Sequence, residues 1–120
     1  MMKLNHLSLA VPDVRETAAF MKAFFGFDIT ANKGNIIIVL ENGEGFVLVL
    51  TTGKQEDTHY PTDFHFGFIA GSEAEVTAKY EEMLAGGFDI ARTPSNIRGS
   101  LGFYFHAPGG IMMEVSCNLK

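Results

Sequence analysis

The alternation of apolar and polar residues divides the chain into two halves with the same order of predicted elements. In the first half, residues 4–11 alternate apolar and polar side chains, as a strand with one buried face does. Asp13 can cap a helix, with Glu16 completing a capping box, and Asn42-Gly43 is a strong hairpin signal. The pattern predicts a strand, a helix, an extended segment and two strands, over residues 4–11, 14–25, 27–29, 36–40 and 46–50.

The second half begins with another alternating strand, Phe64–Ile69. Ser72 and Glu75 form a second capping box before an apolar stripe at helical spacing, and Gly86-Gly87 ends the predicted helix. Later segments are a repeat of the tripeptide Phe27-Asp28-Ile29 at 88–90, a predicted polar loop at 92–102 and a hairpin at 103–115, with its Pro-Gly-Gly turn at 107–110.

Each half therefore has the order βαβββ, and one half alone would leave a sheet face uncovered. We predict a single domain of residues 1–120, with module one over about 1–53 and module two over about 63–120, joined by a polar linker at 51–62. The predicted class is α+β, in which both modules form one open, U-shaped mixed sheet with the helices outside.

Composition narrows the classes of partner and location. The chain has 120 residues, and 9 basic against 14 acidic residues give a net charge of −5 without a Lys/Arg cluster, so we expect no nucleic-acid binding. No apolar run is long enough to span a membrane, and no signal-peptide pattern is present. The single cysteine, Cys117, cannot form an internal disulfide. We expect a cytoplasmic protein without a membrane partner.

Three polar residues stand out in apolar strands. Glu114 alternates with Met113 and Val115 and so lies on the face opposite to theirs, where a carboxylate needs a partner. His6 and His65 occupy equivalent places in the two modules, each on the face away from the apolar residues of its strand. Two imidazoles and one carboxylate form a facial triad for a divalent metal, with positions left open for a ligand. We predict that these three residues bind such an ion.

The segments LNHLSLAVPDV, DFHFGF and FYFHAPGGIMMEV resemble the signature strands of the vicinal oxygen chelate superfamily, which includes glyoxalase I, bleomycin-resistance proteins and extradiol dioxygenases. The resemblance covers nearly the whole chain. It implies a glyoxalase-like fold, a homodimer, a small-molecule ligand and a divalent ion (Fe, Mn, Zn or Ni) on His6, His65 and Glu114. The fourth ligand position of the family matches Val49.

Valine can neither coordinate a metal nor transfer a proton, so the resemblance does not extend to a standard glyoxalase I. It leaves open a metal-dependent lyase, dioxygenase or small-molecule transferase acting on an oxygen-rich molecule. The alternative is a metal-free protein that binds a small molecule, such as an antibiotic, and confers resistance to it. Four residues are weaker candidates for contact with the ligand in either case: Ser8, Val49, Arg98 and Tyr104.

Overall fold

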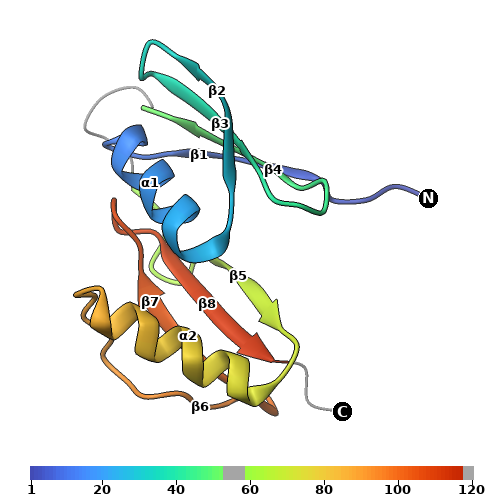
Figure 1. Ribbon diagram of the computed structural model, residues 1–120, viewed down its shortest axis with the longest axis vertical. Helices are drawn as coiled ribbons and strands as arrows, with labels where there is room; N and C mark the ends of the chain where they lie inside the picture. The colour runs from blue at the N-terminus through green and yellow to red at the C-terminus, as the bar shows by residue number, and fades with distance from the viewer. Residues whose placement is uncertain (53–58, 118–120) are drawn as a thin grey trace. The chain divides into compact units, whose positions relative to one another are not determined.

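The computed structural model describes residues 1–52 and 59–117 and divides the chain into two compact units, Met1–His59 and Tyr60–Lys120 (Figure 1). The predicted linker at 51–62 lies partly outside the described residues. Within them, no helix is long and apolar enough to cross a bilayer. Each unit contains one helix and one mixed sheet of four strands, so the predicted α+β class and the βαβββ order of both modules are confirmed. The two modules were predicted to share one sheet, and the structure has a separate hydrogen-bonded sheet in each module.

The first unit forms a sheet in the order β1-β4-β3-β2, in which β1 and β4 are parallel and the other pairs are antiparallel. Helix α1 packs against one face of this sheet (Figure 1). The core between them consists of apolar side chains that include Leu9, Met21, Leu48 and Leu50. The bounds are β1 His6–Ala10, α1 Val14–Phe25, β2 Asp28–Lys33, β3 Ile37–Glu41 and β4 Val47–Thr51.

Helix α1 begins and ends as its sequence predicts. The carboxylate of Asp13 accepts hydrogen bonds from the backbone N–H groups of Arg15 and Glu16, which would otherwise be unpaired in the first turn. Gly26 ends the helix with a left-handed backbone, φ 70°, which costs a glycine little. These two caps fix the direction in which the chain leaves β1 and enters β2.

The second unit repeats the arrangement, with the strand order β5-β8-β7-β6 and helix α2 against one face (Figure 1). The predicted cap is present in a shifted form: the Ser72 hydroxyl accepts from the N–H of Glu75, while the Glu75 side chain accepts from the N–H of Gly71, one residue before the N-cap. The bounds are β5 His65–Ala70, α2 Glu73–Ala85, β6 Ser95–Ile97, β7 Ser100–His106 and β8 Met112–Cys117.

The polar loop predicted at 92–102 is wrong. Residues 95–97 form the short edge strand β6, and β7 already begins at Ser100. Between them, Arg98 and Gly99 make a two-residue turn with positive φ angles of 50° and 86°, as the tight turns of hairpins require. The strand has few apolar residues, and its turn carries an arginine where Asn or Gly is usual, so the sequence lacked the ordinary hairpin signal.

The strand register shows that the two modules are equivalent residue by residue. On β1, Ser8 lies opposite Val49 of β4; on β5, Gly67 lies opposite Glu114 of β8. His6 and His65 each lie two residues before that position, opposite Val47 and Met112. Since paired residues share a face of a sheet, both histidines lie on the sheet face opposite the helix. The register also supports the match of Val49 to Glu114.

Candidate functional site

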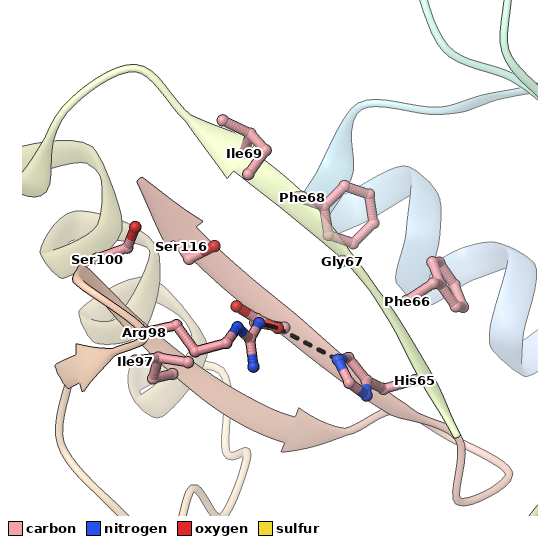
Figure 2. A pocket seen from close by; sticks show the side chains of 10 residues that line it. His65, Phe66, Gly67, Phe68, Ile69, Ile97, Arg98, Ser100 and Ser116 are labelled. Atoms are coloured by element: carbon pink, nitrogen blue, oxygen red, sulfur yellow. Dashed lines mark hydrogen bonds and ion pairs between the residues drawn. The ribbon is translucent and has the colours of Figure 1, made fainter. Parts of the chain in front are cut away.

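The face of the second sheet opposite α2 is polar around Glu114, which lies on the central strand β8. Gly67 of β5 and Tyr104 of β7 are its neighbours in register on either side. A cavity of about 340 Å³ opens over this face, large enough for a small ligand. Figure 2 shows the side chains around it, which come from β5, the β6–β7 hairpin and β8 and include His65, Ile69, Ile97, Arg98, Ser100, Glu114 and Ser116.

Gly67 allows strands β5 and β8 to approach each other closely next to Glu114. A Cβ atom on Gly67 would lie 2.6 Å from the carbonyl oxygen of Glu114 and 3.0 Å from its Cβ. Gly102 of β7 lies opposite Ser116 of β8 and is similarly close to it. A Cβ atom on Gly102 would lie 2.8 Å from the Cβ of Ser116. The two glycines thus leave room above the central strand for the carboxylate and for a ligand.

Gly67→Ala is expected to lower the free energy of unfolding by about 1–3 kcal/mol, since the added methyl group must push strand β5 from β8. Gly43→Ala is the matched control. A Cβ atom at Gly43 has no atom within 4 Å, and its φ is not in the left-handed region, so the change should stay within about 0.5 kcal/mol. Urea unfolding of both variants measures the difference. Equal stabilities would show that the strands separate without cost.

Glu114 and His65 are paired within the site. The Glu114 side chain is 10% exposed, and its Oε1 lies 3.3 Å from Nε2 of His65. The other ring nitrogen, Nδ1, lies 3.0 Å from the carbonyl oxygen of Asp63. A carbonyl can only accept, so Nδ1 carries a proton; in the neutral imidazole Nε2 then presents a lone pair to the carboxylate, and in the protonated ring Nε2 donates to it. Two acceptors facing each other at this distance require a proton or a metal ion between them.

Arg98 approaches the same carboxylate oxygen from the β6–β7 turn. Its Nη2 lies 3.5 Å from Oε1 of Glu114, and its Nη1 donates to the hydroxyl of Tyr104 at 3.5 Å. The pKa of Arg98 is raised, first by the hydrogen bond to Tyr104 and to a lesser degree by the charge of Glu114. The Tyr104 ring stands edge-on to that of His65, with 5.3 Å between centroids. Both partners of the carboxylate therefore contact Tyr104.

The corresponding face of the first sheet carries His6, Ser8 and Val49. Nδ1 of the exposed His6 lies 2.8 Å from the side-chain oxygen of Asn5. Ser8 is exposed, and Val49 is half-buried among the apolar residues Val39 and Val47. The first module thus presents one imidazole beside an apolar surface, where the second presents an imidazole beside a carboxylate.

The structure brings four of the predicted site residues together, namely His65, Arg98, Tyr104 and Glu114. His6, Ser8 and Val49 lie in the other unit. Taken by itself, neither unit has a group of three His, Cys, Asp or Glu side chains among its described residues that could hold a metal.

Sequence reasoning missed Gly67, Gly102, Ser100 and Ser116 as parts of the site. The two glycines interrupt otherwise apolar strands, and an isolated glycine in a strand often marks a close backbone approach or a bound ligand. That signal was present for Gly67, two residues after His65 and opposite Glu114. Alternation along the strand already places Ser116 on the face of Glu114, but nothing in the sequence marked it as a site residue. Ser100 falls in the predicted polar loop, and only its position on β7 brings it to the same cavity.

Comparisons with known proteins agree with this architecture. A sequence model of the Glyoxalase/Bleomycin resistance protein/Dioxygenase superfamily matches residues 3–115. No curated protein matches the chain significantly. The structure of a possible glyoxalase from Bacillus cereus is 33% identical, with a TM-score of 0.87, over 98% of this chain and 100% of that one.

More distant structures share the fold. A glyoxalase-related enzyme from Fulvimarina pelagi is 25% identical, with a TM-score of 0.78, over 98% of this chain and 89% of that one. A lactoylglutathione lyase from Agrobacterium tumefaciens is 19% identical, with a TM-score of 0.81, over 98% of this chain and 95% of that one. The predicted glyoxalase-like fold is confirmed, and the chain belongs to the Glyoxalase/Bleomycin resistance protein/Dioxygenase superfamily.

Proposed function

We propose that the protein is a divalent-metal-dependent enzyme acting on a small oxygen-rich molecule, with His6, His65 and Glu114 as the metal ligands. The observation that supports this most is the pair of acceptors formed by His65 and Glu114. The carbonyl of Asp63 fixes the imidazole so that Nε2 faces Oε1 of the carboxylate. Metal-binding histidines commonly donate their second ring N–H to such a carbonyl. A divalent ion held by these two residues would remove the repulsion that a neutral imidazole and the carboxylate exert on each other.

The spacing of the two atoms also fits one ion. Nitrogen and oxygen ligands lie about 2.0–2.2 Å from a transition metal, so two adjacent ligands of the same ion are roughly 3.0–3.5 Å apart. The 3.3 Å between Nε2 and Oε1 falls in this range. Iron, manganese, zinc and nickel all accept this ligand set, and we propose one of them as the resident ion.

A bound divalent ion would polarise an oxygen of the substrate as a Lewis acid. The residues of the chain have other tasks. Glu114 neutralises one charge of the ion, and burial of this carboxylate keeps water from competing for it. Gly67 leaves the space in which the substrate lies beside the ligands. His6 is the third ligand of the proposed set, as the family resemblance implies, and it is the register equivalent of His65 in the first module.

Metal uptake by the purified protein tests the proposal. Wild type is expected to bind about one divalent ion per chain after dialysis, and His65→Ala is expected to bind none under the same conditions. His106→Ala is the matched control, since His106 lies exposed at the end of β7 in the same sheet and outside the cavity of Glu114. A wild type without metal above background would overturn the enzyme proposal.

A second function is favoured by one observation. Arg98 already neutralises Glu114 in the described contacts, so the cluster is also consistent with a metal-free protein that binds a small molecule. In that case a protonated His65 and Arg98 share the carboxylate. The two functions differ in the response to metal, because only the first predicts uptake that depends on His65.

Assembly and location are further parts of the proposal. The sheets end at the edge strands β1, β2, β5 and β6, and unpaired strand edges favour pairing or coverage. Together with the family, this supports a homodimer, for which light scattering at micromolar concentration should give twice the mass of one chain. Cys117 is buried and free, consistent with a reducing cytoplasm.

A further inference from the structure

A second cavity lies at the outer edge of strand β7. Its volume is about 240 Å³, and its lining residues come from β7, from β6 and from the segment that leads into β6. Among the described residues, it shares only Ile97 with the cavity over Glu114. On β7 the lining residues are consecutive, from Gly102 to His106, although successive side chains of a strand point to opposite faces of the sheet. What such a run has in common is its backbone, so the cavity follows the edge of the strand.

The backbone of β7 extends past its neighbour along this cavity. Strand β6 pairs with residues 100–102 of β7. The two-residue turn makes Ile97 and Ser100 a hydrogen-bonded pair, and such pairs alternate along an antiparallel ladder. The even-numbered residues of β7 therefore direct their N–H and C=O groups away from β8. For Tyr104 and His106, no backbone partner lies on that outer side within the part of the chain that the structure describes.

The shape of the cavity decides what can pair with these groups. The N–H and C=O of one extended residue point to the same side, so a complementary ligand needs an acceptor and a donor on one edge. An open-chain trans amide has them on opposite edges, whereas an amide held cis in a ring has both on one edge. A longer peptide strand would collide with β6, because Ser95 already lies opposite Gly102. The segment that contains Asp89 and Thr93 forms the facing wall.

We propose that the outer edge of β7 binds a small planar cyclic amide, of the pyrimidinone or purinone type, through the backbone of Tyr104 or His106. At about 240 Å³ the cavity is slightly smaller than the pockets of drug-sized ligands, so it suits a compound of one or two rings. Asp89 and Arg92 on the facing wall supply polar groups for the far edge of the ring. None of the proposed metal ligands lines this cavity, so the inference goes beyond the proposed function and does not depend on it.

NMR titration of the isotope-labelled protein with uracil tests the proposal. Uracil at millimolar concentration is expected to shift the amide signals of Tyr104 and His106 more than those of Phe103 and Phe105, whose N–H groups face β8. The analogue of uracil that is methylated on both ring nitrogens keeps the ring but has no N–H donor. It should bind about three- to tenfold more weakly, the range of one lost hydrogen bond.

Two pairs of variants test the backbone contact itself. Tyr104→Pro and His106→Pro each remove one outward N–H, which an edge position tolerates because no ladder bond is lost. Tyr104→Ala and His106→Ala are the matched controls, since they remove the same side chains and keep the N–H. At least one proline variant is expected to bind uracil about three- to tenfold more weakly than its alanine control.

The amide spectrum shows whether each variant is folded, and the comparison of the two uracils in wild type decides the matter if a proline variant is not. Wild type that binds neither compound would overturn the inference. Equal binding of uracil and its methylated analogue, or shifts confined to residues outside this cavity, would overturn it as well. Equal affinities within both pairs of folded variants would also contradict it, because the backbone would then make no contact.

Discussion

Replacing Glu114 by glutamine is expected to abolish the stabilisation that a divalent ion at the proposed site would give. An ion that binds only the folded state raises the free energy of unfolding by about 2.7 kcal/mol at a hundredfold excess over its dissociation constant. Glutamine is nearly isosteric but supplies no negative charge to the ion, so this increment should disappear. Thermal melts of wild type and Glu114→Gln, each with chelator and with excess manganese or zinc, measure it.

The same variant distinguishes the two proposed functions by the sign of its effect without metal. If His65 is neutral, the amide of Gln can donate to the Nε2 lone pair and still accept from Arg98, so the chelated variant should be as stable as wild type or more so. If a protonated His65 is paired with the carboxylate, Glu114→Gln loses a charge-assisted contact, worth roughly 1–3 kcal/mol.

Glu81→Gln is the control for the loss of one negative charge, because Glu81 is exposed on helix α2. It should follow wild type in both conditions. A wild-type melting temperature that is indifferent to every ion tested would contradict the assignment of Glu114 as a ligand. Combined with a less stable Glu114→Gln, it would favour the metal-free binding protein.

The elements that the sequence predicted well are those with strong local signals. Helix α1 lies between a capping aspartate and a glycine in the left-handed conformation, and both its limits were predicted. The sequence also indicated that His65 and Glu114 could be partners, since each is a polar residue on the open face of an apolar strand. A buried carboxylate requires a partner, and the repeat indicated which histidine was equivalent to His6.

Other features depend on contacts that no local pattern reveals. Strand β6 has three residues and gains its regular structure from pairing with β7. Its conformation therefore depends on tertiary contacts, which the local sequence pattern does not show. Arg98 reaches Glu114, sixteen positions further along the chain, because a tight turn and the strand hairpin after it place the two together. The close approach of Gly67 to the backbone of Glu114 likewise exists only when β5 and β8 are in register.

Val49→Glu is expected to add a metal ligand to the protein. The register makes Val49 the equivalent of Glu114 in the first module, on the face that carries His6. Outer-sphere partners of a metal site already change affinity about 10- to 100-fold, so a direct carboxylate ligand should raise the affinity for manganese or zinc at least about tenfold. Without metal, the new charge on a half-buried surface should lower the free energy of unfolding by about 1–3 kcal/mol.

Val39→Glu is the matched control for this gain. Val39 is also half-buried, lies opposite Val49 on β3 and shares its face, and corresponds in register to Tyr104 of the second module. It should show the same loss of stability without metal and no gain in metal affinity.

Wild type should not isomerise the glutathione hemithioacetal of methylglyoxal, because Val49 supplies no carboxylate for proton transfer. Turnover by wild type, or equal metal affinities in the two variants, would show that Val49 does not occupy the fourth ligand position.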